Sequence, residues 1–461
     1  MRVKTKTGIV GTDMQSSIHL LDRVFRSLFV ALAVGLGWGI RGDFGHMLGA
    51  MYPGAALGLA FAFVTGQKSA FKWMPVLGLF GGLGISLGGM MSYGILHGYA
   101  KADTLINYSY GFFTLVLQGG AWGGFGCALL GLILEKKRLR LEEWASLVAT
   151  VLAFGWTAYQ IVVTLLAFHI NPPRSDLSIG YTGGIVGLFV WLVLKGKGYG
   201  LKGAFFGYLG FGLGMAGGRL LANASYQLPF AINNWNIMEV SCGLIGGFVF
   251  AFGMLGKEVP EFPEDGWHPL LSKLGILYVM AGIPLYHRLL RSDPGQRLEE
   301  WANSAKSLGI EDPSAFAERT LFTLHAVCLL GFLGAGLWLW LHLKNKTRLA
   351  AFPILFFSLV MLLFQNTNAL YFWRPPAENG VNMHTVFWVL FGLMVLYVLI
   401  ARPSASIDPD EVAEDLNWRR WTVGAVAAYV LIVAFAGFVN GEKTMASANT
   451  RFPLWSWRDG Q

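Results

Sequence analysis

Apolar runs about as long as a membrane-spanning helix recur along the whole chain. There are about thirteen of them, most near the ~20 residues that a helix needs to cross the hydrocarbon of a bilayer. None alternates apolar and polar residues as membrane-barrel strands do, so helices are the only spanning structure left. The sequence therefore predicts an all-α polytopic membrane protein with about thirteen transmembrane helices. The runs cover residues 22–40, 47–65, 74–97, 110–135, 145–169, 178–196, 201–222, 237–256, 269–287, 321–343, 349–365, 383–401 and 421–439.

Charged residues are scarce, and the basic ones gather beside the apolar runs. The chain is 54% hydrophobic and 13% charged, which leaves too little polar surface to solvate a globule of this size. Basic residues beside membrane helices mark the cytoplasmic side, and Arg2, Lys4, Lys6, Arg23 and Arg26 assign the N-terminus to that side. An odd number of spans then makes the C-terminus extracytoplasmic. The lipid bilayer is the first expected partner, and no nucleic acid is expected to bind.

The loops that strict alternation assigns to the cytoplasm are nearly all basic. Lysines and arginines that snorkel at helix ends would not by themselves produce this alternation. We therefore expect a multi-pass protein of the cell (inner) membrane, and the polar N-terminal stretch does not resemble a cleavable signal peptide. The loops in question are residues 67–72, 136–140, 195–202, 257–273, 344–348 and 402–420.

An internal repeat organises the first half of the chain. Residues 41–135 recur loosely at 174–256, and the glycine-rich segments 81–89 and 123–125 match 210–218 and 246–248. Glycine-rich membrane helices resemble one another by composition, but the match of Arg41-Gly-Asp43 with Arg174-Ser-Asp176 is independent of glycine and favours a duplication. Each unit holds an even number of helices, so the two units are expected to share one orientation, related by an axis along the membrane normal. The prediction is a parallel 4+4 arrangement of the first eight helices.

The remaining chain lacks both the glycine density and the repeat, and we expect a second domain or a scaffold there. The predicted organisation is a cytoplasmic segment (1–21), membrane repeat unit 1 (22–137), membrane repeat unit 2 (138–257), a C-terminal five-helix membrane region (258–443) and an extracytoplasmic tail (444–461).

Polar residues concentrate at the predicted extracytoplasmic ends of the duplicated helices. Ionisable side chains at breaks between hydrophobic spans are costly unless they pair or face water, so they mark the first place to look for function. The sequence predicts a polar cavity that opens outward between the two units. The candidate substrate-binding residues are Arg41, Asp43, His46, Arg174, Asp176, Arg219, Asn223, Trp235 and Glu239.

These residues permit two functional interpretations. In the first, arginine forks bind an anionic or sugar-like solute in a transporter or permease, and Asp43, Asp176 or Glu239 carries a proton. In the second, Asp43 and His46 belong to the active site of a membrane enzyme, glycosyl- or acyltransferase-like or metal-assisted, that acts on a lipid-linked or extracytoplasmic substrate. A structural reading also stays open, in which Arg41 pairs with Asp43, and Arg174 with Asp176, only to fix helix ends.

Dense catalytic and cofactor motifs do not appear. The chain has no His-Glu-x-x-His segment, and its one Gly-x-Ser-x-Gly match, Gly84-Ile-Ser86-Leu-Gly88, lies inside a glycine-rich apolar run that we interpret as helix packing. No catalytic residue, cofactor or metal site is therefore assigned. Cys127, Cys242 and Cys328 lie inside apolar runs without a C-x-x-C pair, and we expect small buried apolar groups there rather than disulfides or metal ligands. Substrate, coupling ion and oligomeric state are not specified by these patterns.

Overall fold

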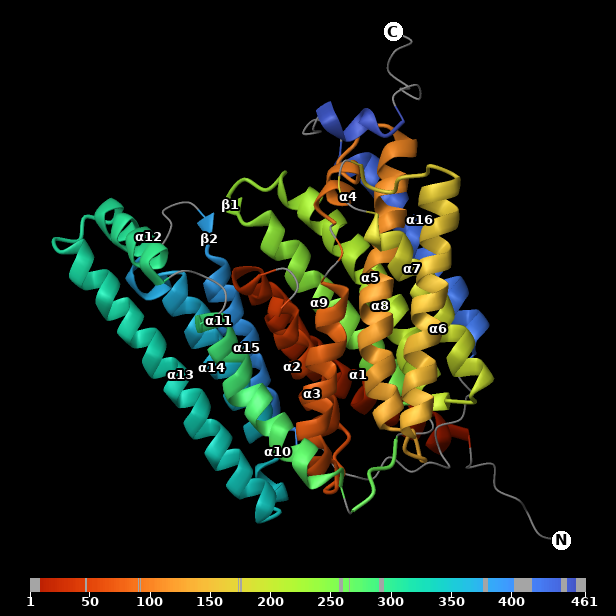
Figure 1. Cartoon of the computed structure of the whole chain (residues 1–461), viewed down its shortest axis with the longest axis horizontal. Helices are drawn as coiled ribbons and strands as arrows, with labels where there is room; N and C mark the ends of the chain where they lie inside the picture. The colour runs from red at the N-terminus through yellow and green to blue at the C-terminus, as the bar shows by residue number, and fades with distance from the viewer. Residues whose placement is uncertain are drawn as a thin grey trace.

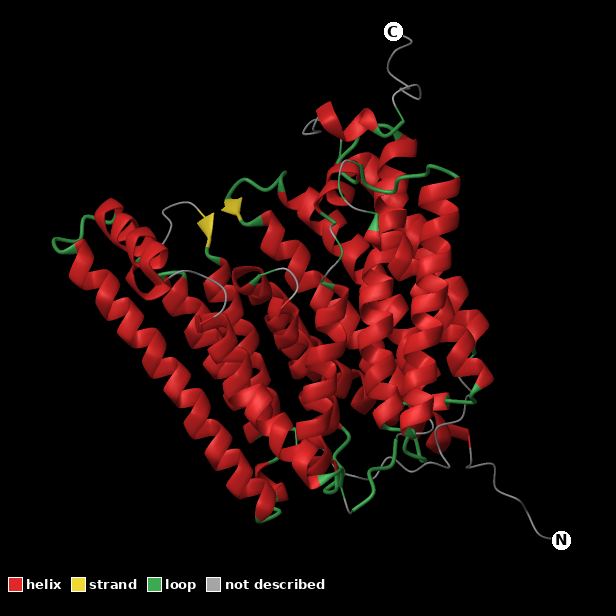
Figure 2. Cartoon of the chain, in the orientation of Figure 1, coloured by secondary structure: helices red, strands yellow, loops and turns green. Residues whose placement is uncertain are grey.

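The computed structural model describes residues 9–45, 48–89, 91, 93–172, 174, 176–256, 260–264, 266–289, 294–375, 380–401, 417–440 and 446–452. Within these residues the chain is almost entirely helical (Figure 2). Ten of the described helices are long and apolar enough to cross a membrane. This confirms the prediction of an all-α, multi-pass membrane protein.

Each apolar run of the sequence falls largely on helical structure. In the first half the elements are α1 (Ile9–Ile40), η1 (Arg41–Phe44), η2 (Leu48–Ala50), α2 (Met51–Val64), α3 (Ala70–Gly88), α4 (Gly94–Tyr99), α5 (Leu105–Ile133), α6 (Leu141–Tyr159), η3 (Gln160–Leu165), α7 (Leu177–Leu194), α8 (Gly198–Ser225), β1 (Ala231–Ile232) and α9 (Asn234–Met254). In the second half they are α10 (Pro269–Leu277), η4 (Tyr278–Gly282), α11 (Ile283–Leu289), α12 (Pro294–Ser307), α13 (Pro313–Leu343), η5 (Thr347–Leu349), α14 (Phe352–Asn368), η6 (Tyr371–Trp373), β2 (Gly380–Val381), α15 (Met383–Ile400), α16 (Trp418–Val439) and η7 (Ala446–Thr450).

The run at 74–97 predicts one helix, but the structure divides it. α3 ends at Gly88 and α4 begins at Gly94. Glycine disfavours a helix interior by about 1 kcal/mol relative to alanine, and Gly88 and Gly89 stand together at this point. The link between the two helices carries Tyr93, whose hydroxyl accepts a hydrogen bond from Arg41 at the end of α1. The break therefore supplies a polar group to the interior of the bundle.

α1 lies near the middle of the molecule and packs on α2, α9 and α15 (Figure 1). α5, α8 and α9 pack in succession on one side of it, and α13 and α14 lie on the other. The apolar window of α5 is 78% buried, whereas those of α6 and α16 are 6% buried. α6 and α16 thus turn their apolar side chains outward, as lipid-facing helices do. The three cysteines are free and buried, which confirms their expected place in apolar surroundings.

Glycines permit the closest helix crossings in the first half. A Cβ at Gly84 on α3 would lie 2.9 Å from the Cα of Gly126 on α5. A Cβ at Gly210 on α8 would lie 2.9 Å from the carbonyl oxygen of Gly246 on α9. Because a side chain would not fit at either distance, only glycine allows these backbones to approach so closely.

Several of the basic loops meet at one end of the bundle. Gln67 Nε2 donates a hydrogen bond of 2.9 Å to the carbonyl oxygen of Pro260, and Arg138 donates one of 2.6 Å to that of Gly266. These contacts join the loop before α3 and the loop after α5 to the segment before α10. α4, β1 and β2 lie at the opposite end (Figure 1). The loops that alternation assigns to one side thus lie together, while the membrane face that they occupy stays a prediction.

β1 and β2 form a short parallel pair at the end of the bundle where α4 lies (Figure 2). Ala231 pairs with Gly380, and Ile232 pairs with Val381. β1 lies between α8 and α9, whereas β2 precedes α15. The pair therefore connects the glycine-rich half to the C-terminal region.

Candidate functional site

Arg41 stands at the centre of a buried polar group between helices. Its guanidinium donates hydrogen bonds to the hydroxyl of Tyr93 and to Glu239 Oε1, the latter at 2.9 Å. The side chains of Arg41 and Glu239 are only 1% and 2% exposed. The Arg41 guanidinium carbon lies 5.5 Å from the ring centroid of Trp38 and 5.1 Å from that of Trp122, within the range of cation–π attraction. We call these five residues the Arg41 cluster.

The backbone explains why the Arg41 cluster forms here. α1 ends at Ile40 and passes into the 3-10 turn η1, so Arg41 follows directly on a buried helix end. α9 begins after Asn233, whose side chain accepts hydrogen bonds from the backbone N–H groups of Trp235 and Asn236 at 3.1 and 3.2 Å. This cap sets the register of α9. It thereby places Glu239 in the second turn, opposite Arg41.

Arg41 pairs with Glu239, not with Asp43 as the structural reading proposed. Arg41 and Asp43 are two residues apart in a helical turn, and side chains at that spacing do not face one another. Arg41 points inward and is buried, whereas Asp43 is exposed. The partner of Arg41 therefore comes from a helix about two hundred residues along the chain, which no local pattern indicates.

Asp43 links the glycine-rich half to the C-terminal region. Gln365 Nε2, on α14, donates a hydrogen bond of 2.6 Å to Asp43 Oδ2. Gln365 Oε1 lies 3.0 Å from His384 Nδ1 on α15. Because an amide oxygen only accepts, His384 carries its proton on Nδ1 in this arrangement. The result is a chain of carboxylate, amide and imidazole across three elements.

Trp235 and His97 lie beside the Arg41 cluster. The ring of Trp235 stacks on Tyr93 with centroids 6.0 Å apart and contacts His97 edge-on at 5.1 Å. Trp235 lies one turn before Glu239 on α9. Trp235 is 39% exposed. It therefore separates the buried ion pair from the surface at this end of the bundle.

A second buried arginine lies on α8. Arg219 is 1% exposed, and its Nε donates a hydrogen bond of 2.6 Å to Asn223 Oδ1. Asn223 Nδ2 in turn donates to the carbonyl oxygen of Ala100 at 3.0 Å and to Asn440 Oδ1 at 2.7 Å. Among the described residues, no carboxylate forms an ion pair with Arg219, and its other contact is the phenol of Tyr226.

Lys101 extends this group toward the surface. Its ammonium donates a hydrogen bond of 2.8 Å to the hydroxyl of Tyr226. Burial acts to raise the pKa of Tyr226, but hydrogen bonds and charges from Lys101 and Arg219 outweigh it and lower that pKa overall. The local field thus favours a negative charge. We call Arg219, Asn223, Tyr226, Lys101 and Asn440 the Arg219 cluster.

Asp176 and Arg174 do not pair with each other. Asp176 Oδ2 lies 2.7 Å from His169 Nδ1, and Asp176 Oδ1 accepts a hydrogen bond of 2.9 Å from the backbone N–H of Ile170. Arg174 is exposed and forms no ion pair with any other described residue. Arg174 and Asp176 thus lie at a third place, apart from both arginine clusters. The candidate His46 lies outside the described residues.

The eight described candidates are thus distributed over four places, because Asp43 lies apart with Gln365 and His384. Arg41, Glu239 and Trp235 meet in and beside the Arg41 cluster, while Arg219 and Asn223 meet in the Arg219 cluster. α4 lies against both, because His97 contacts Trp235 and the carbonyl oxygen of Ala100 accepts from Asn223. In the part of the chain that the structure describes, no three His, Cys, Asp or Glu side chains are grouped as a metal site requires.

Sequence reasoning missed several residues of the two clusters and both residues that follow Asp43 in its hydrogen-bonded chain. Tyr93, Trp122, Gln365, His384 and Asn440 were not among the candidates. Gln365 and His384 flank the loop between two apolar runs, and polarity at that position was their only signal. Tyr93 and Trp122 lie within apolar runs, where aromatic residues are ordinary and carry no signal of function.

Comparisons with protein-family models, with curated proteins and with solved structures gave no match to this chain. The function is therefore inferred from the two arginine clusters and from the chain of Asp43, Gln365 and His384.

Proposed function

We propose that this chain is a secondary transporter or related permease for a small polar solute of anionic or sugar-like type. The observation that carries the proposal is the buried Arg41–Glu239 pair at the junction of two interrupted helical segments. Non-helical backbone at membrane depth is typical of solute sites in transporters, where it lines the binding cavity.

A buried ion pair is a poor device for stability alone. Removing two charges from water costs several kcal/mol per ion, and well-packed apolar residues often stabilise as well or better. Arg41 instead keeps a planar fork of donors beside a carboxylate, which is the geometry that a carboxylate or phosphate ligand uses. An anionic solute could take the place of Glu239 on this fork. Trp38 and Trp122 supply flat faces on which a sugar-like solute could stack.

Arg219 supports an anionic solute independently. A buried guanidinium that meets only neutral partners is unfavourable, and a bound anion would relieve that cost. The lowered pKa of Tyr226 indicates that the surrounding field stabilises negative charge. We therefore place the outer part of the solute path beside the Arg219 cluster and its inner part at the Arg41 cluster.

Energy would come from an ion gradient or from a partner. If a solute anion displaces Glu239 from Arg41, the freed carboxylate is buried and would take up a proton. Glu239 is thus our first candidate for proton coupling, ahead of Asp43 and Asp176. Solute and proton would then move together.

A membrane enzyme is the second candidate, and one observation favours it. Asp43 is exposed, and Gln365 and His384 hold it in a fixed position, as an acid/base carboxylate requires. In that case the substrate would be lipid-linked or extracytoplasmic, as in glycosyl- or acyltransferases. The two functions differ in whether a solute crosses the bilayer unchanged.

We further propose that α1, α2 and α8 also cross the membrane, which gives about thirteen spans with the N-terminus cytoplasmic and the C-terminus extracytoplasmic. The 4+4 duplication is part of this proposal. It is supported by equivalent helix pairs, α3 with α5 and α8 with α9, that both cross at glycines. The inner (cell) membrane is the expected location.

The test is solute uptake by proteoliposomes that contain the purified chain. A thermal-shift screen of organic acids, sugars, amino acids and inorganic anions first selects ligands, because a compound at ten times its dissociation constant stabilises by about 1.4 kcal/mol. Radiolabelled hits are then tested for uptake by the wild type and by Glu239→Gln, Arg219→Gln and Arg374→Gln. Arg374 is an exposed arginine outside both clusters and serves as the control.

We expect Glu239→Gln and Arg219→Gln to abolish uptake and Arg374→Gln to retain it. Equal uptake by all four proteins would refute the assignment of the site. Binding without uptake, together with chemical conversion of a lipid-linked substrate that Asp43→Asn abolishes, would establish the enzyme instead.

A further inference from the structure

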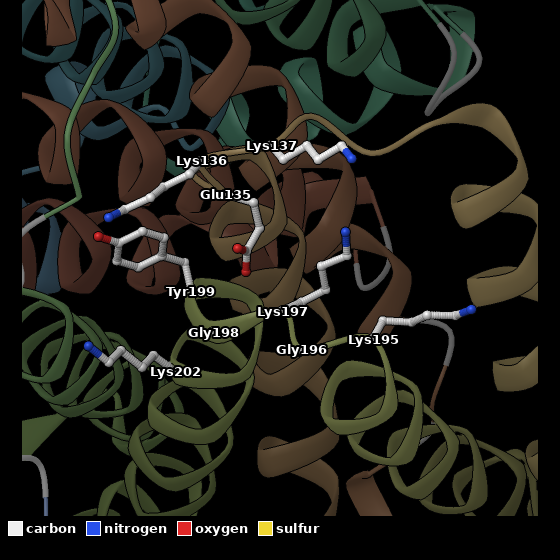
Figure 3. Close-up of a pocket in the computed structure, with 9 residues that line it drawn as sticks. All are labelled: Glu135, Lys136, Lys137, Lys195, Gly196, Lys197, Gly198, Tyr199 and Lys202. Atoms are coloured by element: carbon white, nitrogen blue, oxygen red, sulfur yellow. The ribbon is translucent and has the colours of Figure 1, made fainter.

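Another polar site lies at the opposite end of the bundle, far from α4. It is a cavity of about 330 Å³ between the loop after α5 and the turn that joins α7 to α8 (Figure 3). Ligand pockets begin at about this volume. Its lining residues are Glu135, Lys136, Lys137, Lys195, Gly196, Lys197, Gly198, Tyr199 and Lys202.

The lining carries a large excess of positive charge. Five of the nine lining residues are lysines, and Glu135 is the single carboxylate among them. Figure 3 shows the carboxylate of Glu135 between the lysines, with the ammonium groups of Lys136 and Lys202 on one side of the view and those of Lys137 and Lys197 on the other.

Internal partners neutralise only part of this charge. Lys197 Nζ lies 2.7 Å from Glu143 Oε1, which gives that lysine a carboxylate of its own. Glu135 Oε1 accepts a hydrogen bond of 2.9 Å from the backbone N–H of Gly200 and so caps the start of α8. Lys136, Lys137 and Lys195 are exposed and form no hydrogen bond or ion pair with other described side chains. The cavity therefore has unused donors for an anion.

The surroundings of the cavity are apolar and exposed. Leu194, at the end of α7, is 78% exposed, and Leu141, at the start of α6, is 84% exposed. The apolar window of α6 is only 6% buried. A molecule that places an anionic group among the lysines would therefore find an apolar surface for a hydrocarbon tail immediately beside it.

We propose that this cavity binds the anionic phosphate headgroup of a membrane lipid, with its acyl chains lying along the exposed faces of α6 and α7. Basic pockets between membrane helices on the cytoplasmic side suit such headgroups. The apolar rim favours a lipid over a free phosphate, because a soluble ion would gain nothing from the exposed leucines. The site is separate from the two arginine clusters.

If these lysines only set the membrane topology, other exposed basic residues on the same face should contribute equally to lipid binding. If the cavity binds the headgroup, the lysines that line it should contribute more. The loop after α13 offers a matched control, because Lys344, Lys346 and Arg348 are also exposed and are assigned to the same face by alternation. The test compares Lys136→Gln/Lys137→Gln/Lys195→Gln with Lys344→Gln/Lys346→Gln/Arg348→Gln. Each variant removes three positive charges from exposed positions.

Binding is measured by titration calorimetry on the purified full-length protein in a non-ionic detergent. The probes are dioctanoyl phosphatidylglycerol, dioctanoyl phosphatidylcholine and inorganic phosphate. We expect the wild type to bind phosphatidylglycerol at least tenfold more tightly than the other two probes. The cavity variant should lose at least tenfold in affinity for phosphatidylglycerol, and the control variant should stay within twofold of the wild type.

Three results would overturn the proposal. Equal binding of phosphatidylcholine would show that the headgroup charge is not recognised. Inorganic phosphate that binds as tightly as phosphatidylglycerol would assign the cavity to a soluble anion. Equal losses in the two triple variants would show that net charge, and not the cavity, attracts the lipid. Unchanged thermal unfolding of both variants serves as the folding control.

Discussion

Replacing Glu239 with glutamine should destabilise the protein strongly, because it leaves the Arg41 guanidinium buried without a counter-charge. Both side chains are at most 2% exposed and their atoms meet at 2.9 Å. Breaking a buried pair by removing one partner costs about 3–5 kcal/mol. Glutamine keeps an oxygen that can accept the hydrogen bond from Arg41, so we expect a loss near the lower end, about 3 kcal/mol.

Asp43→Asn is the matched control. Asp43 is two residues from Arg41 but is exposed and not paired with it. Its replacement keeps an oxygen to accept from Gln365, so the expected cost is below about 1 kcal/mol. The free energy of unfolding would be measured for both variants by reversible denaturation in mixed micelles of a non-ionic detergent and sodium dodecyl sulfate.

A double variant separates charge from packing. Arg41→Met/Glu239→Met removes both charges. Its cost in free energy of unfolding should therefore be at least about 1 kcal/mol smaller than the sum of the costs of Arg41→Met and Glu239→Met measured singly. The reasoning fails if Asp43→Asn destabilises as much as Glu239→Gln, because Arg41 would then depend on Asp43. It also fails if the two methionine substitutions are additive, which would mean that the pair is not coupled.

Three further predictions concern a glycine helix crossing, the hydrogen bonds of Asn440 and the orientation in the membrane. Gly210→Ala should lower the thermal unfolding temperature, because overpacking at a backbone contact costs about 1–3 kcal/mol, whereas Gly392→Ala, with nothing within 4 Å of its Cβ position, should not. Asn440→Ala should cost about 1–3 kcal/mol in the same assay, since it removes the donor to the carbonyl oxygen of Ala102 and an acceptor of the buried Asn223 amide. A membrane-impermeant maleimide applied to intact cells should label Ser307→Cys and spare Lys68→Cys, and the wild type should react little because its cysteines are buried; the reverse pattern would invert the proposed orientation.

The sequence was a good guide to the helices and a partial guide to the site. Apolar length alone identified the helices, because a bilayer imposes the same requirement on each span. It did not identify the break after Gly88, since glycine is also common inside membrane helices that pack closely. The distinction depends on what each glycine contacts, and that is a property of the folded bundle.

The candidate site shows the same limit. Arg41, Arg219 and Glu239 are among the polar residues that the sequence analysis singled out as costly unless they pair or face water, and all three are buried. Their pairing could not be predicted, because Arg41 and Glu239 are 198 residues apart in the chain. Arg174 matched Arg41 in the repeat pattern, yet it is exposed. Sequence position therefore indicated which residues are costly to bury, but not which of them the fold brings together.

The parallel pair of β1 and β2 limits how the two halves can move. The pair joins the loop before α9 to the segment before α15 by backbone hydrogen bonds. The helix α9 carries Glu239, and the helix α15 carries His384. Any motion that draws these two segments apart must break the hydrogen bonds between β1 and β2, whereas a rotation about the β1–β2 pair leaves them intact. A hinge motion about Ala231 and Gly380 would therefore keep these hydrogen bonds, whereas separation of the two segments would break them.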